Sequence, residues 1–220
     1  MKKMLLCFIV VLGCVAMTLV DGIIQPGYFI KSTVKLVFFL AIPLLFSKKL
    51  KLSFSGAFRP KRQSIIIGSV LGVAAFCVIL GAYRLLHPHL DLSGVVHALE
   101  STAGVTKDNF LFVGTYIALC NSLLEEFFFR YFAFLGLERN GNKLFAYIFS
   151  AAAFAIYHAG MLITMVAPLL FALALVALFA CGLLLNYLNG CSQTIWVSWL
   201  LHMGANLAIN TVGMILLGIL

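Results

Sequence analysis

Long apolar stretches dominate this chain and recur at short intervals along it. They cover residues 1–20, 28–46, 64–86, 109–137, 144–158, 161–185 and 194–220. A helix needs about 20 apolar residues to cross a bilayer. The pattern therefore predicts an all-α fold, a polytopic transmembrane helix bundle with about seven spans (about six to eight), forming a single integral-membrane domain over residues 1–220. The fourth stretch is longer than a bilayer requires, so we expect it to tilt, bend or extend beyond the hydrocarbon core.

Composition and charge agree with a membrane protein and indicate its orientation. Hydrophobic residues make up 63% of the chain and charged residues 10%, whereas soluble domains are about 45–50% apolar and about 25% charged. The formal net charge of +8 is dispersed over loop ends, which argues against nucleic acid as a partner. The segment 47–62 carries basic residues and no acid, and the turn after residue 137 is also basic, so the positive-inside rule places both in the cytoplasm with the N-terminus inside. Lys31 and Lys35 lie in the first half of the second stretch. We expect both side chains to extend along the helix so that their charged ends snorkel to the outer membrane interface.

Ionisable side chains interrupt the apolar pattern at three places. Glu125, Glu126 and Arg130 lie within the segment 121–131, NSLLEEFFFRY, and further polar groups follow in FAIYH and HMGAN, namely His158, His202 and Asn206. A charged group at the bilayer centre costs about 2.5–3.5 kcal/mol on insertion scales. Such residues face one another or a wet cavity, and they mark functional sites by default.

Helical spacing and depth predict that these groups meet. Glu126 and Arg130 are four residues apart, so they share a helix face and can form an ion pair. His202 and Asn206 share a face in the same way. At a rise of about 1.5 Å per residue, Glu125, His158 and His202 all lie near the middle of the bilayer or to its cytosolic side. The alternative is a buried polar network that only holds the helices together.

The chemistry available to such a site is hydrolytic. A carboxylate near the middle of the bilayer can, together with one histidine, take a proton from water and make it a nucleophile. A second histidine and an asparagine amide can donate to an oxyanion. This arrangement needs no cofactor, and we favour it. The alternative is a zinc site with Glu125, His158 and His202 as ligands.

Three motifs in order resemble those of the CAAX prenyl protease and bacteriocin-processing (CPBP, or Abi) family of intramembrane proteases. The family pattern is EExxxR, then FxxxH, then HxxxN. In this chain it reads Glu125–Arg130, Phe154–His158 and His202–Asn206. The resemblance covers residues 121–209, and the segment 109–210 carries the motifs. It implies an intramembrane endopeptidase of the glutamate type that hydrolyses a peptide bond with activated water.

The resemblance also implies roles, substrates and location. Glu125 and His158 would activate the water, His202 and Asn206 would form the oxyanion site, and Glu126 and Arg130 would support it. The substrate would be a peptide or a lipidated membrane protein, and the chain would be a bacterial protein of the cytoplasmic membrane, acting in bacteriocin processing or a related maturation. Other candidate functions are a non-catalytic immunity or scaffold protein, and a transporter that relays protons through Glu125 and Glu126.

Overall fold

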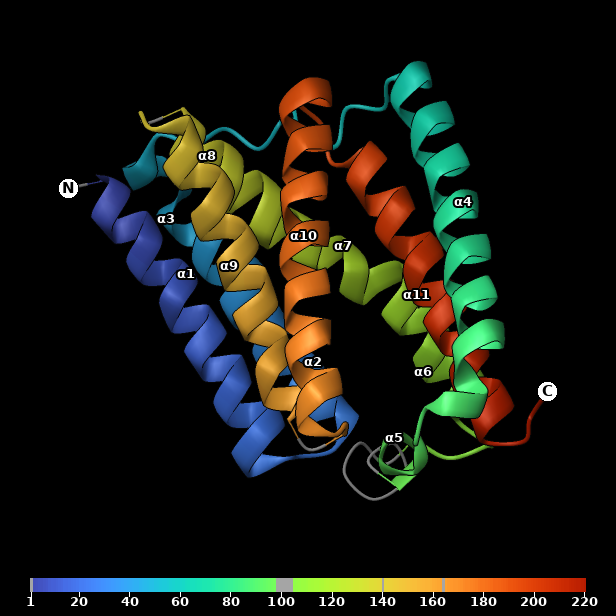
Figure 1. Ribbon diagram of the computed structural model, residues 1–220. Coiled ribbons are helices and arrows are strands. Elements are labelled where there is room, and N and C mark those ends of the chain that lie inside the picture. The colour runs from blue at the N-terminus through green and yellow to red at the C-terminus, as the bar shows by residue number, and fades with distance from the viewer. Residues whose placement is uncertain (1, 98–104, 140, 164) are drawn as a thin grey trace.

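The computed structural model describes residues 2–97, 105–139, 141–163 and 165–220, and within them every regular element is a helix (Figure 1). The α-helices are α1 (Lys2–Leu19), α2 (Tyr28–Leu36), α3 (Ile42–Leu50), α4 (Arg62–Leu86), α5 (Ser93–His97), α6 (Phe110–Tyr116), α7 (Ser122–Glu125), α8 (Gly136–Glu138), α9 (Lys143–Leu162), α10 (Pro168–Ser192) and α11 (Trp196–Leu216). Several are joined end to end by π-helical segments, namely η1 (Val20–Ile24), η2 (Val37–Ala41), η5 (Ile117–Asn121) and η6 (Glu126–Leu135), and the 3-10 turn η3 (His87–His89) follows α4.

These elements combine into membrane-spanning helices of the expected number. Among the described residues, seven helices are long and apolar enough to cross a membrane: Lys2–Ile24, Tyr28–Leu50, Arg62–His89, Phe110–Glu138, Lys143–Leu162, Pro168–Ser192 and Trp196–Leu216. The predicted all-α bundle of about seven spans is confirmed, and the chain is an integral membrane protein.

The largest differences from the predicted boundaries occur between the fifth and sixth spans. The fifth apolar stretch was expected to end at residue 158, but α9 continues through Gly160 to Leu162. A Cβ at Gly160 would lie 3.0 Å from the Thr18 side chain, so this glycine allows α9 to pack closely on α1. The next helix begins later than residue 161, at Pro168, where a missing backbone N–H costs no helical hydrogen bond.

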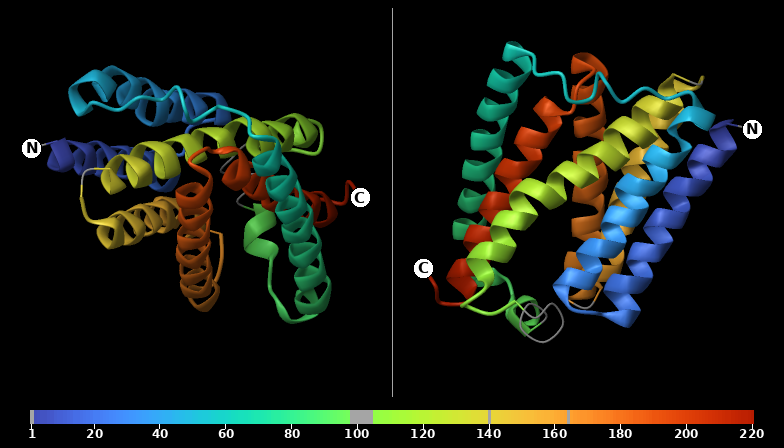
Figure 2. Two further views of the ribbon diagram at one scale, coloured as in Figure 1. Left: turned by 90° about the horizontal axis from the view of Figure 1, so that it is seen from above. Right: turned by 180° about the vertical axis from the view of Figure 1, so that it is seen from behind.

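Both basic segments lie at the same end of the bundle as the N-terminus, and the C-terminus lies at the other end (Figure 1). The loop that joins α3 to α4 crosses this end of the molecule (Figure 2, left). Backbone carbonyls fix it to α11, because Ala57 O accepts from the Ile195 amide at 3.1 Å and Phe58 O accepts from Trp196 Nε1 at 3.1 Å.

The fourth span, Phe110–Glu138, runs diagonally across the bundle (Figure 2, right). Of the alternatives for this long stretch, tilting is the one observed. It is built from α6, η5, α7, η6 and α8, and its π-helical parts have wider turns than an α-helix. Segments of π-helix inside α-helices are frequent at functional sites, and here the change from α7 to η6 falls between Glu125 and Glu126.

Aromatic side chains fill the core around this tilted span. Every residue of η6 is buried. Phe128 stacks on Phe39 with ring centroids 4.1 Å apart, and Phe129 meets Phe154 edge to face at 5.4 Å. This packing fixes the tilted span between α2–α3 on one side and α9 on the other.

On the opposite side of the bundle, α11 packs against α4 through glycines. A Cβ at Gly204 would clash with the Gly72 backbone, and a Cβ at Gly72 would clash with the Leu200 carbonyl. Only glycine permits this close approach of the two backbones. The contact lies next to His202 in sequence and therefore sets where that side chain is presented.

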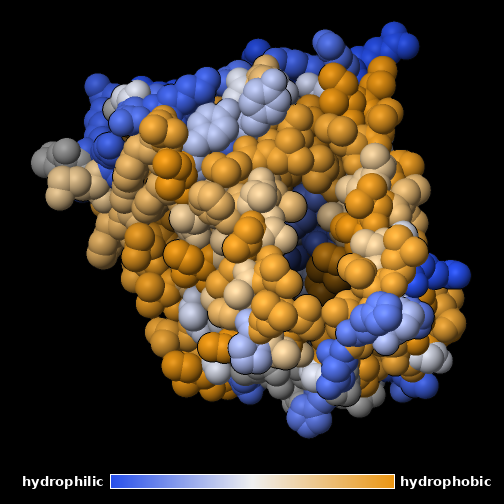
Figure 3. Space-filling view, viewed as in Figure 1, coloured by the Kyte–Doolittle hydropathy of each residue, from blue (hydrophilic) through white to orange (hydrophobic). Residues whose placement is uncertain are grey.

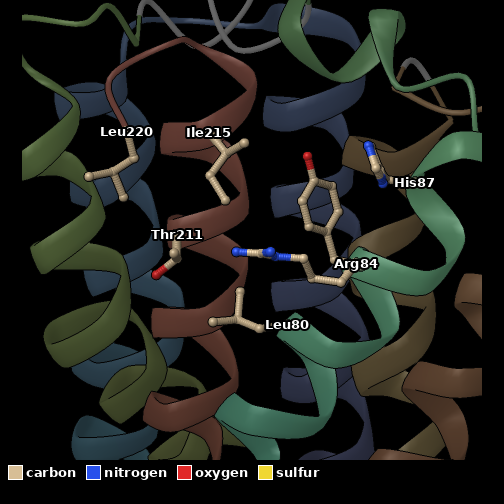
Figure 4. A pocket seen from close by; sticks show the side chains of 7 residues that line it. Leu80, Arg84, His87, Thr211, Ile215 and Leu220 are labelled. Carbon is tan, nitrogen blue, oxygen red and sulfur yellow. The ribbon is translucent and has the colours of Figure 1, made fainter.

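The surface has a hollow that leads toward the tilted span. Figure 3 shows it between apolar walls, with hydrophilic residues at the bottom. In the same orientation the hollow lies between α10 and α11, with α7 behind it (Figure 1). A separate cavity of about 590 Å³ lies between α4 and α11 (Figure 4). Its lining is Leu80, Tyr83, Arg84, His87, Thr211, Ile215 and Leu220, which includes none of the predicted site residues.

Candidate active site

Three spans bring the predicted polar residues together in the interior. Glu125 ends α7 and Glu126 begins η6, while His158 lies on α9 and His202 lies on α11. Glu125 is 2% exposed, Glu126 is 0% exposed and His202 is 8% exposed. The structure therefore places the two carboxylates and the His202 imidazole in one buried cluster, and the half-buried His158 imidazole lies beside Glu125.

The two oxygens of the Glu125 carboxylate have different surroundings. Three groups donate hydrogen bonds to Oε1: Lys35 Nζ at 2.9 Å, Asn121 Nδ2 at 2.8 Å and Tyr157 Oη at 3.1 Å. Within the part of the chain that the structure describes, Oε2 has no hydrogen-bond partner. It faces both histidines, with His158 Nε2 at 3.7 Å and His202 Nε2 at 3.8 Å.

The orientation of each imidazole is set by a bond from its other nitrogen. His158 Nδ1 donates to the Phe154 carbonyl at 2.8 Å, and His202 Nδ1 donates to Glu126 Oε1 at 2.9 Å. Both acceptors lack a proton to give, so both Nδ1 atoms carry hydrogen. Each Nε2 therefore points at Glu125 Oε2. In a neutral ring this nitrogen carries a lone pair and accepts a hydrogen bond, and in a charged ring it carries a hydrogen and donates one.

Glu126 and Arg130 form the pair predicted from their spacing. Arg130 Nε lies 3.5 Å from Glu126 Oε2, and both side chains are 0% exposed. The guanidinium also lies over the Phe154 ring, 4.1 Å from its centroid. The Phe154 carbonyl holds His158, so Arg130 supports both Glu126 and the helix turn that orients His158.

Asn206 takes a different place in the structure. Its Nδ2 donates to the Ile117 carbonyl at 3.3 Å, and one turn further on Asn210 Nδ2 donates to the Gly114 carbonyl at 2.7 Å. Both bonds join α11 to the tilted span. The bond to Ile117 uses one hydrogen of the Asn206 amide, and the second is left for another acceptor.

Two residues of the cluster, Lys35 and Tyr157, were not predicted from the sequence to contact Glu125. The expectation that Lys35 snorkels to the interface is wrong, since it is 6% exposed and paired with Glu125. A lysine in an apolar span is itself a signal of a buried partner. Tyr157 stands beside His158, but nothing distinguished its phenol from that of an ordinary core aromatic residue.

The charges of this cluster balance. Lys35 offsets Glu125 and Arg130 offsets Glu126, so the buried site is neutral when both histidines are neutral. Among the described residues, no group of three or more His, Cys, Asp or Glu side chains is arranged to hold a metal ion.

Fold and site together define a polytopic membrane protein with a buried carboxylate–histidine centre. The family model described as "Type II CAAX prenyl endopeptidase Rce1-like" matches residues 107–208, a range that contains all three motifs. Residues 107–208 are therefore similar to this family of CAAX-protease-like intramembrane endopeptidases, in agreement with the family predicted from the motifs. The helices α1 to α5 lie outside the matched range. No curated protein and no solved structure matched the chain.

Proposed function

We propose that the chain hydrolyses a peptide bond with a water molecule held between Glu125, His158 and His202. The observation that carries this proposal is the free Oε2 of Glu125, which faces two imidazole nitrogens at 3.7 and 3.8 Å. These separations are too long for direct hydrogen bonds and suit a bridging water. Such a water gives one hydrogen to Glu125 Oε2 and the other to the lone pair of His158 Nε2.

The reaction then follows general-base chemistry. As the water oxygen bonds to the peptide carbonyl carbon, its proton passes to Glu125. The carbon–nitrogen bond breaks when that proton is delivered to the departing amine, which leaves a new carboxyl terminus and a new amine. Glu125 is regenerated as a carboxylate, and no covalent intermediate with the protein is formed.

His202 and Asn206 stabilise the negative charge that develops on the carbonyl oxygen. His202 Nδ1 already donates to Glu126, so Nε2 donates only when the ring is doubly protonated. The Glu126 carboxylate holds the ring in the orientation that turns Nε2 toward the site, and this is the role we assign to it. The free hydrogen of the Asn206 amide supplies the second donor.

The proposed mechanism needs no metal. The His202–Asn206 pair supplies the stabilisation that a Lewis acid would otherwise give. The alternative is a zinc-dependent protease with Glu125, His158 and His202 as ligands, and a chelator distinguishes it from the metal-free mechanism.

We propose a peptide or lipidated membrane protein as substrate, because the hollow has apolar walls and a hydrophilic floor (Figure 3). Bacteriocin-type precursors in a bacterial cytoplasmic membrane fall within this class.

Cleavage by the detergent-purified protein tests the proposal. A pool of fluorogenic peptides, with and without a prenyl group, is compared for the wild type and Glu125→Ala, each with and without a strong zinc chelator. We expect turnover that Glu125→Ala abolishes and the chelator leaves unchanged. Loss of turnover in the presence of the chelator would show that hydrolysis depends on zinc. Full turnover by Glu125→Ala would reject the mechanism, and absence of turnover with every peptide would favour the scaffold function.

A further inference from the structure

We infer that Lys35 is a positioning residue of this site, which holds one oxygen of Glu125 so that the other is free for the reacting water. The inference rests on the proposed function. It concerns a residue from α2, outside the range 107–208 that the family model matches. The helices at the N-terminal end of the chain thereby complete the chemistry that the motif-bearing spans carry.

The first argument is that the two oxygens of the Glu125 carboxylate differ in their hydrogen bonds. Oε1 accepts from Lys35, Asn121 and Tyr157, which exceeds the two bonds that a carboxylate oxygen commonly accepts. Oε2 has no such donor among the described residues. Donors from three different helices therefore fix the carboxylate plane and turn Oε2 toward His158 and His202.

The second argument is the burial of the lysine itself. Its Nζ also donates to Asn121 Oδ1, and it lies 4.9 Å from the Tyr157 ring centroid and 5.6 Å from that of Phe39. Two oxygens and two aromatic faces thus replace the water around the ammonium. A lysine that only snorkelled would keep its charged end in water.

The third argument is that α2 is anchored one turn away. Lys31 lies 3.5 Å from Asp21 at the end of the first span, so the preceding turn of α2 is tied to its neighbour. This pair fixes the rotation of α2 and aims Lys35 at Glu125. Lys49, an exposed lysine at the end of α3 that has no part in this pair, is the matched control.

The consequence is electrostatic. The charged and titratable groups that face Glu125 are Lys35 from α2, Tyr157 and His158 from α9, His202 from α11, and Glu126 with Arg130 on its own span, with Asp21 acting from farther away. Without Lys35, two adjacent buried carboxylates would share Arg130. Glu125 would then take up a proton, and a neutral carboxylic acid cannot accept one from water.

Steady-state kinetics of Lys35 variants test this inference. We expect Lys35→Gln to lower kcat at least tenfold with little change in KM, and to move the acidic limb of the pH–activity profile to higher pH. Lys35→Arg keeps the charge and should retain most of the activity, while the control Lys49→Gln should keep the wild-type profile. A wild-type kcat and pH profile in Lys35→Gln would overturn the inference.

Infrared spectroscopy gives a readout that does not depend on turnover. We expect a protonated-carboxyl band in Lys35→Gln at neutral pH that is absent from the wild type and from the double variant Lys35→Gln/Glu125→Gln. If the wild type cleaves no peptide, the proposed function fails while this band still decides the placement of Lys35. Should Lys35→Gln not fold, Tyr157→Phe removes another donor from the same oxygen. An unchanged pH profile in that variant would overturn the inference.

Discussion

At the scale of single residues, Arg130 is the group whose partner matters most for stability. Its guanidinium is fully buried and pairs with Glu126. Removing one partner of a buried ion pair costs about 3–5 kcal/mol, because the other charge is left uncompensated. We therefore expect Arg130→Met to lower the folded yield and the unfolding temperature in detergent.

The double variant Arg130→Met/Glu126→Gln is the matched control for this prediction. It removes both charges, so it should recover most of the stability that Arg130→Met loses. It should stay poorly active, since His202 Nδ1 would lose the carboxylate that holds its ring in place. Equal unfolding temperatures for the wild type and Arg130→Met would contradict the prediction.

The contacts predicted correctly from the sequence are those between residues of the same helix. The pairing of Glu126 with Arg130 follows from a spacing of four residues, and the structure confirms it. The contact of Lys35 with Glu125 joins residues on two spans, and it depends on which face of α2 meets the tilted span. Tyr157 was missed for the same reason. The oxyanion role of Asn206 stays a prediction.

At the scale of helices, the α4–α11 contact positions His202. Gly204 lies against the Gly72 backbone with no room for a Cβ. We expect Gly204→Ala to push the two helices apart, lower the unfolding temperature and reduce turnover by displacing His202. The measurement is thermal unfolding in detergent combined with peptide cleavage.

A control for this prediction lies on α4 itself. A Cβ at Gly81 would meet no atom within 4 Å. Alanine at such a site restricts the unfolded chain and stabilises a protein by about 0.4–1 kcal/mol. Gly81→Ala should therefore be neutral or slightly stabilising, with wild-type turnover. If Gly204→Ala behaved like Gly81→Ala, the close contact would not position the site.

Hydropathy predicted the helices well but not all of their ends. Length and apolar content are local properties, and they are enough to locate spans. The end of α9 depends on how Gly160 meets Thr18, which a single stretch of sequence does not reveal. The change from α-helix to π-helix between Glu125 and Glu126 in the tilted span is likewise set by packing around the backbone.

At the scale of the whole molecule, the two basic segments and the N-terminus share one end of the bundle (Figure 1). We propose that this end faces the cytoplasm. In a variant without the native cysteines, new cysteines at exposed Ser55 and Arg139 should react with a membrane-impermeant maleimide only after the cells are permeabilised. A cysteine at exposed His89, at the end of the third span, should react in intact cells.

Labelling of Ser55 and Arg139 positions from opposite sides would contradict the fold. Labelling of both in intact cells would keep the fold and reverse its orientation. The outcome also decides which end of the bundle that holds Glu125, His158 and His202 faces the cytoplasm.

The measurement that tests the central claim most directly is the rate of peptide cleavage by Glu125→Gln. This substitution keeps the shape of the side chain and removes its ability to take a proton, and general-base catalysis contributes about 10²–10⁴-fold. With the best peptide from the pool, in chelator-treated protein, we predict a fall in kcat of at least about a hundredfold with no loss of folded protein. A Glu125→Gln variant that is folded and cleaves at the wild-type rate would contradict the account.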